Sequence, residues 1–465
     1  MLPGPVSLTP IQHWFFEQHN PQPDYWNHVV VLAIRHGVSA DHLVQALQAL
    51  LEHHQALRLR FGHADGEWLQ ELPAGLPAFT PLRIDLQGLD ANLQEQRMAQ
   101  VERQLHAQIS LSDGTLFAAA VIARGPLRRD ALMLVAHHLV VDAVSWLIIA
   151  DDLELACRQL EQAQALRLPH TPTSFRDWSD ALRQQSIREE AEAQRSYWIK
   201  QLTPPPAPSA AAVSQHASAE LVSVALTSAE TAQLLDDLPR RYRMQPHEIL
   251  TAALALTLAS HFSSSRVRID IERHGRSGLS SAADVSRTVG WFTAIHPLCM
   301  ELEITAPLAE TLRTLKEQLR AVPAEGIGYG ILQYLSGRPL VESGPWGGVL
   351  FNYLGQSQRG AGEDARFEFE RPLALARAPA APRCYNWEIN ARIENALLVI
   401  DWGYSSTHDS SATVGKVAAL LLENLRAIIA AAQGIESRAD SASDFPLAGL
   451  NQDGLDKLSA LLKKS

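Results

Sequence analysis

Apolar residues recur along the chain with two different periods, and the alternation between these periods predicts a mixed α/β fold. Residues 27–34 (NHVVVLAI) are rich in β-branched side chains, which is typical of a strand. Residues 39–53 follow with helical spacing, and Ser39 or Asp41 is suited to cap the helix N-terminus. Because similar alternation continues through most of the chain, we expect layers of helices packed on sheets.

A proline-rich break divides the chain near its middle. Residues 203–218 (TPPPAPSAAAVSQHAS) contain four prolines followed by small residues, a composition typical of a linker. The total length of 465 residues also exceeds what one ordinary core organises. We predict an N-terminal lobe over residues 1–202, a linker over residues 203–218, a C-terminal lobe over residues 219–440 and a tail over residues 441–465.

The second half repeats the pattern of the first. A very apolar helix is expected over residues 246–262, followed by a strand over residues 266–272. Residues 357–383 lack a strong period and predict a long loop. The tail predicts a short amphipathic helix near the end of the sequence.

The run AHHLVVDAVSW places His137, His138 and Asp142 in apolar surroundings. A buried ionisable side chain costs free energy unless it is paired or has a function. Residues 131–136 predict a strand buried on both faces, and a helix is expected from Ala143 onward. The histidines therefore lie at a strand end and the aspartate just before a helix, where catalytic residues of α/β proteins often occur.

Three kinds of site are open for this run: a metal site, a catalytic site and a structural polar cluster. Asp142 alone is well placed as a helix cap. Metal binding is disfavoured, because adjacent residues at a strand end point to opposite sides and no further His or Cys cluster is evident. The pair of histidines favours a division in which one projects into a cleft and the other packs behind it.

Composition excludes several classes of function. The formal charge of -11 and the lack of a basic stripe argue against nucleic-acid binding. No apolar run is long enough to span a bilayer, and the N-terminus has no secretory signal pattern. Cys157, Cys299 and Cys384 are far apart without CxxC spacing, which favours a reducing compartment. We predict a cytoplasmic protein that binds neither nucleic acid nor membrane.

A second polar cluster, in IDIERHGRSG, contains Glu272, Arg273, His274 and Arg276 after a predicted strand. The same composition is also common in a solvated loop. GIGYG lacks the strand-turn-helix context of a dinucleotide site, and no GxSxG nucleophile elbow occurs. Three further segments combine aromatic residues with glycine: RTVGWFT at 287–293, GIGYG at 326–330 and FNYLGQ at 351–356.

Taken in order, these segments resemble the epimerization domains of nonribosomal peptide synthetases. HHLVVD matches the HHxxxD motif of the condensation superfamily, and PIQHWF at residues 10–15 adds a fifth ordered motif. SFRDWS and the SDFPLAGL tail extend the resemblance over nearly the whole chain. The resemblance implies an α/β fold of the α+β sandwich type, with two chloramphenicol-acetyltransferase-like lobes in a V-shaped arrangement and the active site between them.

The resemblance also implies the reaction, which is L-to-D inversion at the Cα of an aminoacyl or peptidyl thioester. The substrate would be carried on the phosphopantetheine arm of an upstream peptidyl carrier protein, with a condensation domain as a downstream partner. The chain itself would bind no cofactor, because the carrier supplies the 4′-phosphopantetheine covalently, and no metal is expected. The protein would therefore be an isomerase of secondary metabolism.

By the same resemblance, His138 and Glu272 face each other across the lobe interface as the catalytic pair. One would remove the Cα proton and the other would return a proton to the opposite face. Asp142 is expected to pair with Arg276 and so fix the loop that presents His138, and His137 is expected to pack as structure.

The resemblance also indicates four residues that are candidates for substrate binding. Trp291, Asn352 and Tyr353 are expected to line the pocket. Tyr329 and its neighbouring glycines are expected to border the approach of the phosphopantetheine arm.

The sequence departs from the family pattern at several positions. Arg273 replaces a glycine beside Glu272, and we expect its charge to lower the pKa of that carboxyl group and weaken it as a base. Ser277 replaces an acid, and Ala143 replaces a glycine that is common after the motif aspartate. His296 stands where tyrosine usually precedes proline.

Two alternative functions share the same motif. An amide-forming condensation domain also has HHxxxD, but Glu272 and FNYLGQ disfavour it. A non-catalytic domain that docks carrier proteins is disfavoured by intact His138 and Glu272, while Arg273 and His296 keep it open.

Overall fold

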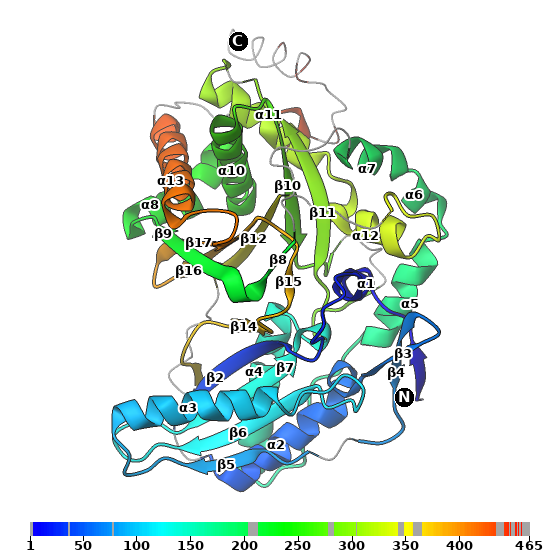
Figure 1. Ribbon diagram of the computed structural model, residues 1–465, viewed down its shortest axis with the longest axis vertical. Helices are drawn as coiled ribbons and strands as arrows, with labels where there is room; N and C mark the ends of the chain where they lie inside the picture. Colours follow the sequence, from blue (N-terminus) through cyan, green and yellow to red (C-terminus); the bar gives the residue numbers. More distant parts are fainter. Residues whose placement is uncertain are drawn as a thin grey trace.

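Two β-sheets flanked by helices form the two lobes of the molecule, one below the other in Figure 1. The structure is a computed structural model and describes residues 3–35, 38–76, 79–202, 213–277, 283–303, 305–342, 348–356, 365–433 and 441–445, with residues 447, 452, 454 and 457. No helix in these ranges is both long and apolar enough to cross a membrane.

The N-terminal lobe is built on a sheet with the strand order β13-β2-β7-β6-β5. Alternate residues of β2 and β7 enter two cores, one shared with α2 and α4 and the other with α3. Helices thus cover both faces, which explains why most positions of these strands are apolar. The elements are β2 (Trp26–Ile34), α2 (Ala40–His53), β5 (Leu82–Asp85), α3 (Ala91–His106), β6 (Phe117–Ala123), β7 (Ala131–His137), α4 (Ala143–Glu161) and β13 (Phe367–Phe369).

Smaller elements surround this sheet. Three strands form a separate antiparallel sheet in the order β1-β4-β3, and three helices follow α4 toward the second lobe (Figure 1). These elements are β1 (Gly4–Val6), α1 (Pro10–Glu17), η1 (Gln55–Arg58), β3 (Arg60–Ala64), β4 (Glu67–Leu72), η2 (His138–Val140), α5 (Phe175–Gln185), α6 (Glu189–Glu192) and α7 (Arg195–Leu202).

The C-terminal lobe has the strand order β11-β10-β12-β16-β17-β9. Helices α10 and α13 pack on one face of this sheet and share its apolar core. The strands are β9 (Ala219–Ala225), β10 (Arg266–Arg273), β11 (Ala294–Glu301), β12 (Val349–Gln356), β16 (Trp387–Glu394) and β17 (Leu397–Ser405). The helices are α8 (Ser228–Ala232), the π-helix η4 (Gln233–Asp237), α9 (Leu238–Tyr242), α10 (Pro246–Phe262), α11 (Leu308–Arg320), η5 (Pro323–Gly326), α12 (Ile327–Tyr334) and α13 (Ser411–Gln433).

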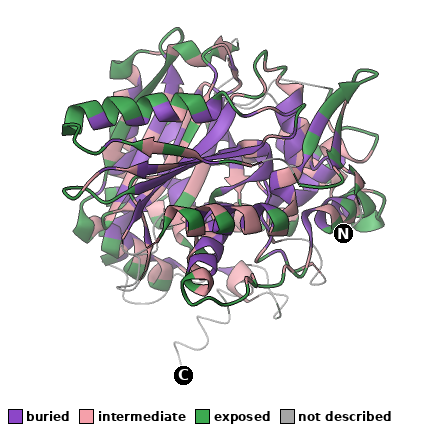
Figure 2. Ribbon diagram, turned by 90° about the horizontal axis from the view of Figure 1, so that it is seen from below, coloured by how far each residue is buried: buried purple, intermediate pink, exposed green. Residues whose placement is uncertain are grey.

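Strand β16 shows how this sheet separates a core from a site. Its residues alternate strictly between buried and partly exposed. Trp387 and Ile389 belong to the core under α13, whereas Glu388 and Asn390 line a cavity on the opposite face. The purple strands in the interior of Figure 2 and the green outer helix surfaces reflect the same arrangement.

The expectation of a long loop over residues 357–383 is wrong for the part that the structure describes. Strands β13 and β14 (Ala374–Arg377) both pair with β2 of the N-terminal lobe, and β15 (Pro382–Arg383) pairs with β8 (Ser214–Gln215). The polar residues of this segment form ion pairs that hold it in place, including Arg35 to Glu368 at 2.9 Å and Arg124 to Glu370 at 2.7 Å. The C-terminal half therefore completes the N-terminal sheet, which a serial division at the linker does not anticipate.

Other expectations have mixed outcomes. The helix over residues 246–262 and the strands near residues 27–34 and 266–272 are confirmed. Ser39, rather than Asp41, caps α2 by accepting a hydrogen bond from the backbone of His42. Part of the predicted linker is structured, since β8 and η3 (His216–Ser218) lie within it, and the predicted helix near the chain end lies outside the described ranges.

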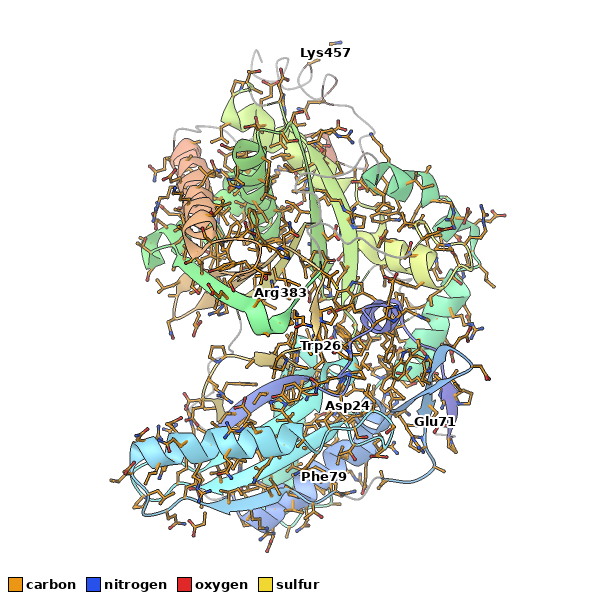
Figure 3. All side chains as sticks on the ribbon, in the orientation of Figure 1. Asp24, Trp26, Glu71, Phe79, Arg383 and Lys457 are labelled. Atoms are coloured by element: carbon orange, nitrogen blue, oxygen red, sulfur yellow. The ribbon has the colours of Figure 1, made fainter. Side chains whose placement is uncertain are left out.

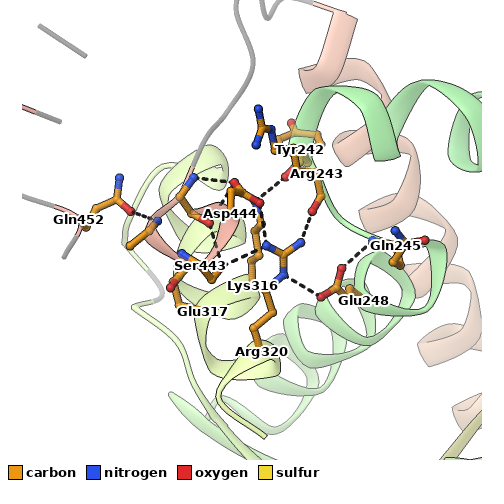
Figure 4. Close-up of polar contacts among 12 residues, drawn as sticks. Tyr242, Arg243, Gln245, Glu248, Lys316, Glu317, Arg320, Ser443, Asp444 and Gln452 are labelled. Carbon is orange, nitrogen blue, oxygen red and sulfur yellow. Dashed lines mark hydrogen bonds and ion pairs between the residues drawn. The ribbon is translucent and has the colours of Figure 1, made fainter. Parts of the chain in front are cut away.

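A short segment after α13 returns to the C-terminal lobe through buried charges (Figure 4). In η6 (Ala442–Asp444), the carboxylate of Asp444 accepts hydrogen bonds from Lys316 at 2.6 Å and from Arg320 at 2.7 Å. Lys316 also donates to the carbonyl of Tyr242 at 2.8 Å. Because the Lys316 and Asp444 side chains are each 2% exposed, neither charge has water as an alternative partner.

Replacing Asp444 with alanine should therefore destabilise the fold. An unpaired buried Lys316 is expected to lower the free energy of unfolding by roughly 3–5 kcal/mol. Urea denaturation followed by circular dichroism measures this change. The matched control is Glu95→Ala, which breaks an exposed pair with Arg128 and should cost less than about 1 kcal/mol. Equal effects of the two substitutions would contradict the assignment.

Candidate active site between the lobes

The two adjacent histidines at the end of β7 have different environments. His137 is completely buried, and its Nε2 lies 2.8 Å from the carbonyl oxygen of Pro23. Its Nδ1 accepts a hydrogen bond from the backbone of Leu139 at 3.1 Å. Both ring nitrogens thus have backbone partners, and burial lowers the pKa of His137 to about 3. His137 is a neutral, structural side chain.

His138 has one ring nitrogen engaged and one free. Its Nδ1 lies 2.8 Å from the carbonyl oxygen of Val141, and because a carbonyl only accepts, Nδ1 holds the proton. The Nε2 atom then has its lone pair available. The ring lies between His28 and Trp291, with centroid distances of 3.9 and 4.2 Å. Burial lowers the pKa of His138 to about 4, so the imidazole is neutral and able to accept a proton.

Asp142 connects the two lobes through Arg276. The guanidinium Nη2 donates to both carboxylate oxygens of Asp142, at 2.8 and 2.9 Å. Nη1 of the same arginine donates to the carbonyls of Val285 and Thr288, both at 2.8 Å. Asp142 also caps α4, because its Oδ1 accepts from the backbone of Ser145 at 2.7 Å. One carboxylate therefore fixes a helix end of the first lobe against a loop of the second.

The loop between β10 and β11 is held close to α4 by further bonds. The hydroxyl of Ser145 donates to the carbonyl of Gly290 at 2.9 Å and accepts from its N–H at 3.1 Å. These bonds place the neighbouring Trp291 over the ring of His138. Gly275 allows the turn that delivers Arg276, because its φ is +62° and a Cβ there would lie 1.8 Å from the carbonyl oxygen of Phe292.

Glu272 reaches the same region from the other sheet. It lies in β10, opposite Ile295 of β11 and Asn352 of β12. Its carboxyl group has no hydrogen bond or ion pair with any residue that the structure describes. Burial raises the pKa of Glu272 to about 7, with Arg377 opposing the rise and Glu388 adding to it.

The expectation that Arg273 lowers the pKa of Glu272 is therefore wrong. Successive strand residues point to opposite faces, and Arg273 lies 3.7 Å from Glu325 instead. Its charge does not contribute to the pKa shift of its neighbour. Sequence adjacency is a poor guide to charge interactions within a strand.

His138 and Glu272 line two adjoining cavities in common. The first, of about 340 Å³, extends toward β2 and β16 and includes Trp291. The second, of about 390 Å³, extends toward α4 and α10 and includes Tyr353. Asn352 lines both cavities. The structure thus brings together the expected catalytic pair and three of the expected substrate-binding residues, with Asp142 in the wall of the second cavity.

Two other candidates do not line these cavities. Tyr329 is buried in α12 with its ring 5.6 Å from that of Trp198, and it lines a smaller cavity of about 30 Å³ that shares Trp14 and Trp291 with the wall of the first cavity. His296 is buried beside the same tryptophan, against Gly326, where a Cβ would lie 1.9 Å from the imidazole. GIGYG thus accommodates His296 and does not border the cavities of His138.

Three residues of the first cavity were not anticipated. Arg377 of β14 lies 3.1 Å from Glu388 of β16 and 4.4 Å from the ring centre of Trp26. Figure 3 shows Trp26 where the two lobes meet. Arg377 lies in the segment expected to be a loop, so no sequence pattern indicated its pairing with Glu388. His28 lies inside β2 next to Asn27, and two polar residues at the start of an otherwise apolar strand were the single available sign.

One cluster elsewhere has the residue types of a metal site. Ligand atoms of His53, His54 and Asp152 lie within 4.8 Å of one another, the one such group in the described part of the chain. The carboxylate of Asp152 is already bonded to His54 at 2.9 Å and to the guanidinium of Arg287. Because an arginine occupies one carboxylate oxygen, the cluster is better explained as a polar contact between the lobes.

Comparison with known proteins identifies the class of domain that this fold and this motif define. The family model described as "Condensation domain" matches residues 4–450. The chain belongs to the condensation domain family. The resemblance to this superfamily inferred from the motifs, and the fold expected from it, are confirmed.

Among curated relatives, a linear gramicidin synthase of Brevibacillus parabrevis is 36% identical over 467 residues, which cover 98% of this chain and 6% of that protein. Tyrocidine synthase 1 of the same organism is 30% identical over 99% of this chain and 44% of its own length. The chain therefore spans less than half of each of these relatives.

Among solved structures, the epimerization domain from the third module of tyrocidine synthetase B superposes with a TM-score of 0.84 at 30% identity, covering 93% of this chain and 97% of that one. The condensation domain of the Monacolin K polyketide synthase superposes with a TM-score of 0.71 at 16% identity, covering 95% of this chain and 99% of that one, and shares the fold.

The conformation at Gly275 supplies a direct test of the site geometry. Gly275→Ala places a Cβ against the Phe292 carbonyl and strains a positive φ, so we expect it to cost more than about 2 kcal/mol of stability. Thermal denaturation measures the loss. Gly415→Ala in α13 meets no atom within 4 Å and should raise stability by up to about 1 kcal/mol. A Gly275→Ala protein as stable as wild type would contradict this account.

Proposed function

We propose that this domain epimerizes the Cα of an aminoacyl or peptidyl thioester carried by a peptidyl carrier protein of a nonribosomal peptide synthetase. The observation that supports the proposal is the pair formed by His138 and Glu272, which line the same cavities from different lobes. Each presents a polar group without a partner in the described residues. The likeness at 30% identity to a solved epimerization domain supports the same reaction.

Inversion requires removal of the Cα proton from one face and delivery of a proton to the other. The pKa of Glu272 is raised to about 7 and that of His138 is lowered to about 4. Between these values the two side chains together hold one proton. The member without the proton acts as base and the member with it acts as acid, and turnover exchanges the roles.

The two cavities suit the two parts of a tethered substrate. The second cavity is lined on its α4 and α10 side by the uncharged Ala143, Val144 and Thr251, beside which an uncharged pantetheine chain could approach His138 and Glu272. The cavity is also lined by Asp142, His247, Arg273 and His274. The first cavity, beyond the pair, would then hold the amino acid side chain or the peptide. The arm arrives on the carrier protein, so the partners of this domain are an upstream carrier and a downstream condensation domain, and the compartment is the cytoplasm.

The pair can be tested with an aminoacyl thioester loaded on a cognate carrier protein in deuterated buffer. We expect His138→Ala and Glu272→Gln each to slow formation of the D-isomer by at least about 100-fold, as for loss of a general acid or base. His63→Ala, at an exposed histidine, is the control and should react at the wild-type rate. Inversion at the wild-type rate in Glu272→Gln would contradict the two-residue assignment.

The one-proton state also predicts a pH profile. Below about pH 4 both side chains are protonated and the pair lacks a base, whereas above about pH 7 both have lost their protons and the pair lacks an acid. The rate of inversion, measured as kcat/KM, should therefore be bell-shaped and fall by about tenfold per pH unit on the alkaline side. A rate that stays constant from pH 7 to about pH 9 would contradict this protonation scheme.

Amide formation is the alternative, because family membership alone is compatible with it. Such a domain needs a second substrate, an acceptor amine on another carrier. Incubation with both a loaded donor carrier and a loaded acceptor carrier distinguishes the two reactions. We expect the D-thioester and no dipeptide, whereas dipeptide formation that depends on His138 would favour the condensation reaction.

A further inference from the structure

His28 lies in the wall of the first cavity but has no role in the two-residue mechanism. It is the third residue of β2 and lies opposite Ala136 of β7, directly before the paired histidines. The residue is 5% exposed, and its ring centre is 3.9 Å from that of His138. Glu272 lines the same cavity, so His28 adjoins His138 and shares a cavity wall with Glu272.

A tryptophan fixes which nitrogen of His28 bears hydrogen. Nε1 of Trp146, in the first turn of α4, lies 3.1 Å from Nδ1 of His28. An indole N–H only donates, so Nδ1 must accept and cannot hold a proton. The proton of the imidazole is therefore on Nε2. Protonation of both nitrogens would break this buried hydrogen bond.

The surroundings also oppose a positive charge on His28. Burial lowers its pKa well below the usual value, and His138, His137 and Arg377 lower it further. All three neighbours are bases or cations, so none of them favours an imidazolium at this position. His28 is thus a neutral imidazole that presents an N–H donor.

That donor is free to bind a ligand. Nε2 of His28 has no hydrogen bond with any residue in the described part of the chain, and it is not sealed from solvent. It therefore opens onto the cavity that His28 lines. A neutral imidazole N–H that faces a substrate cavity is suited to polarise a carbonyl group.

We propose that His28 is a third catalytic residue, whose Nε2–H donates a hydrogen bond to the thioester carbonyl oxygen as that oxygen becomes an enolate. This inference rests on the proposed epimerization. The Cα–H bond breaks and its proton passes to the base. The electron pair forms a double bond between Cα and the carbonyl carbon, and the carbonyl π pair moves to oxygen. The proton of His28 remains on Nε2 throughout, so Trp146 positions the donor by occupying Nδ1.

Substitutions at His28 separate hydrogen-bond donation from packing. His28→Leu keeps an apolar volume but removes the donor, and we expect kcat for Cα deuterium exchange to fall roughly 100-fold or more, with KM changed less than about threefold. His28→Gln retains an amide N–H donor and should keep the rate within about tenfold of wild type. Both variants are assayed with the carrier-bound aminoacyl thioester, and circular dichroism checks folding.

The possible results distinguish this inference from the proposed function. Exchange in His28→Leu at the wild-type rate, or equal loss in folded His28→Leu and His28→Gln, would overturn the assignment of His28 as donor. Absence of exchange in the wild-type protein, with His138→Ala identical, would instead overturn epimerization itself. A large rise in KM without a fall in kcat would assign His28 to substrate binding and also contradict the proposal.

A spectroscopic measurement tests the tautomer without activity. In protein with ¹⁵N-labelled histidine, long-range ¹H–¹⁵N correlation spectra should show His28 with protonated Nε2 and unprotonated Nδ1. Trp146→Phe removes the donor to Nδ1 and should shift His28 toward a mixture of tautomers. A wild-type His28 protonated on Nδ1 would overturn the inference, whatever the kinetics.

Discussion

The arrangement of the site depends on the buried ion pair between Asp142 and Arg276. Both side chains are less than a tenth exposed, and the guanidinium also bonds two carbonyls of its own lobe. A buried pair of this kind contributes little net stability, because the cost of removing both charges from water offsets their attraction. It does fix the geometry, because separating the partners would leave each as an uncompensated buried charge. Since Asp142 caps α4 and Arg276 follows β10, the pair fixes His138 and Glu272 relative to each other.

Burial explains the opposite pKa shifts of the proposed pair. Removal from water disfavours the charged form of any group, so burial lowers the pKa of His138 and raises that of Glu272. One environment thus makes the histidine a base and the carboxyl group an acid near neutral pH. The rings of His28 and Trp291 cover that of His138 at centroid distances of 3.9 and 4.2 Å and contribute to its burial. Burial is the largest cause of both shifts.

Much of this organisation could be predicted from the sequence. The buried strand ending in the two histidines, the capping aspartate and the second polar cluster all follow from local patterns, and the family resemblance brought Glu272 and Arg276 to the same place. Local patterns could not show that β13 and β14 join the N-terminal sheet, because those strands are short and held by ion pairs. The expected effect of Arg273 on the pKa of Glu272 is wrong because strand alternation directs the two side chains to opposite faces. The proposed role of His28 could not be predicted either, because its tautomer is set by a hydrogen bond from Trp146 of α4.

The most direct test of the central claim is a structure of this domain bound to a carrier protein that bears a non-hydrolysable aminoacyl pantetheine. The account predicts that the pantetheine occupies the cavity beside α4, and that the substrate Cα lies between Nε2 of His138 and the carboxyl group of Glu272, with these groups on opposite faces. A substrate whose α-carbon lies against His138 while Glu272 is on the same face, or is out of reach, would contradict the account.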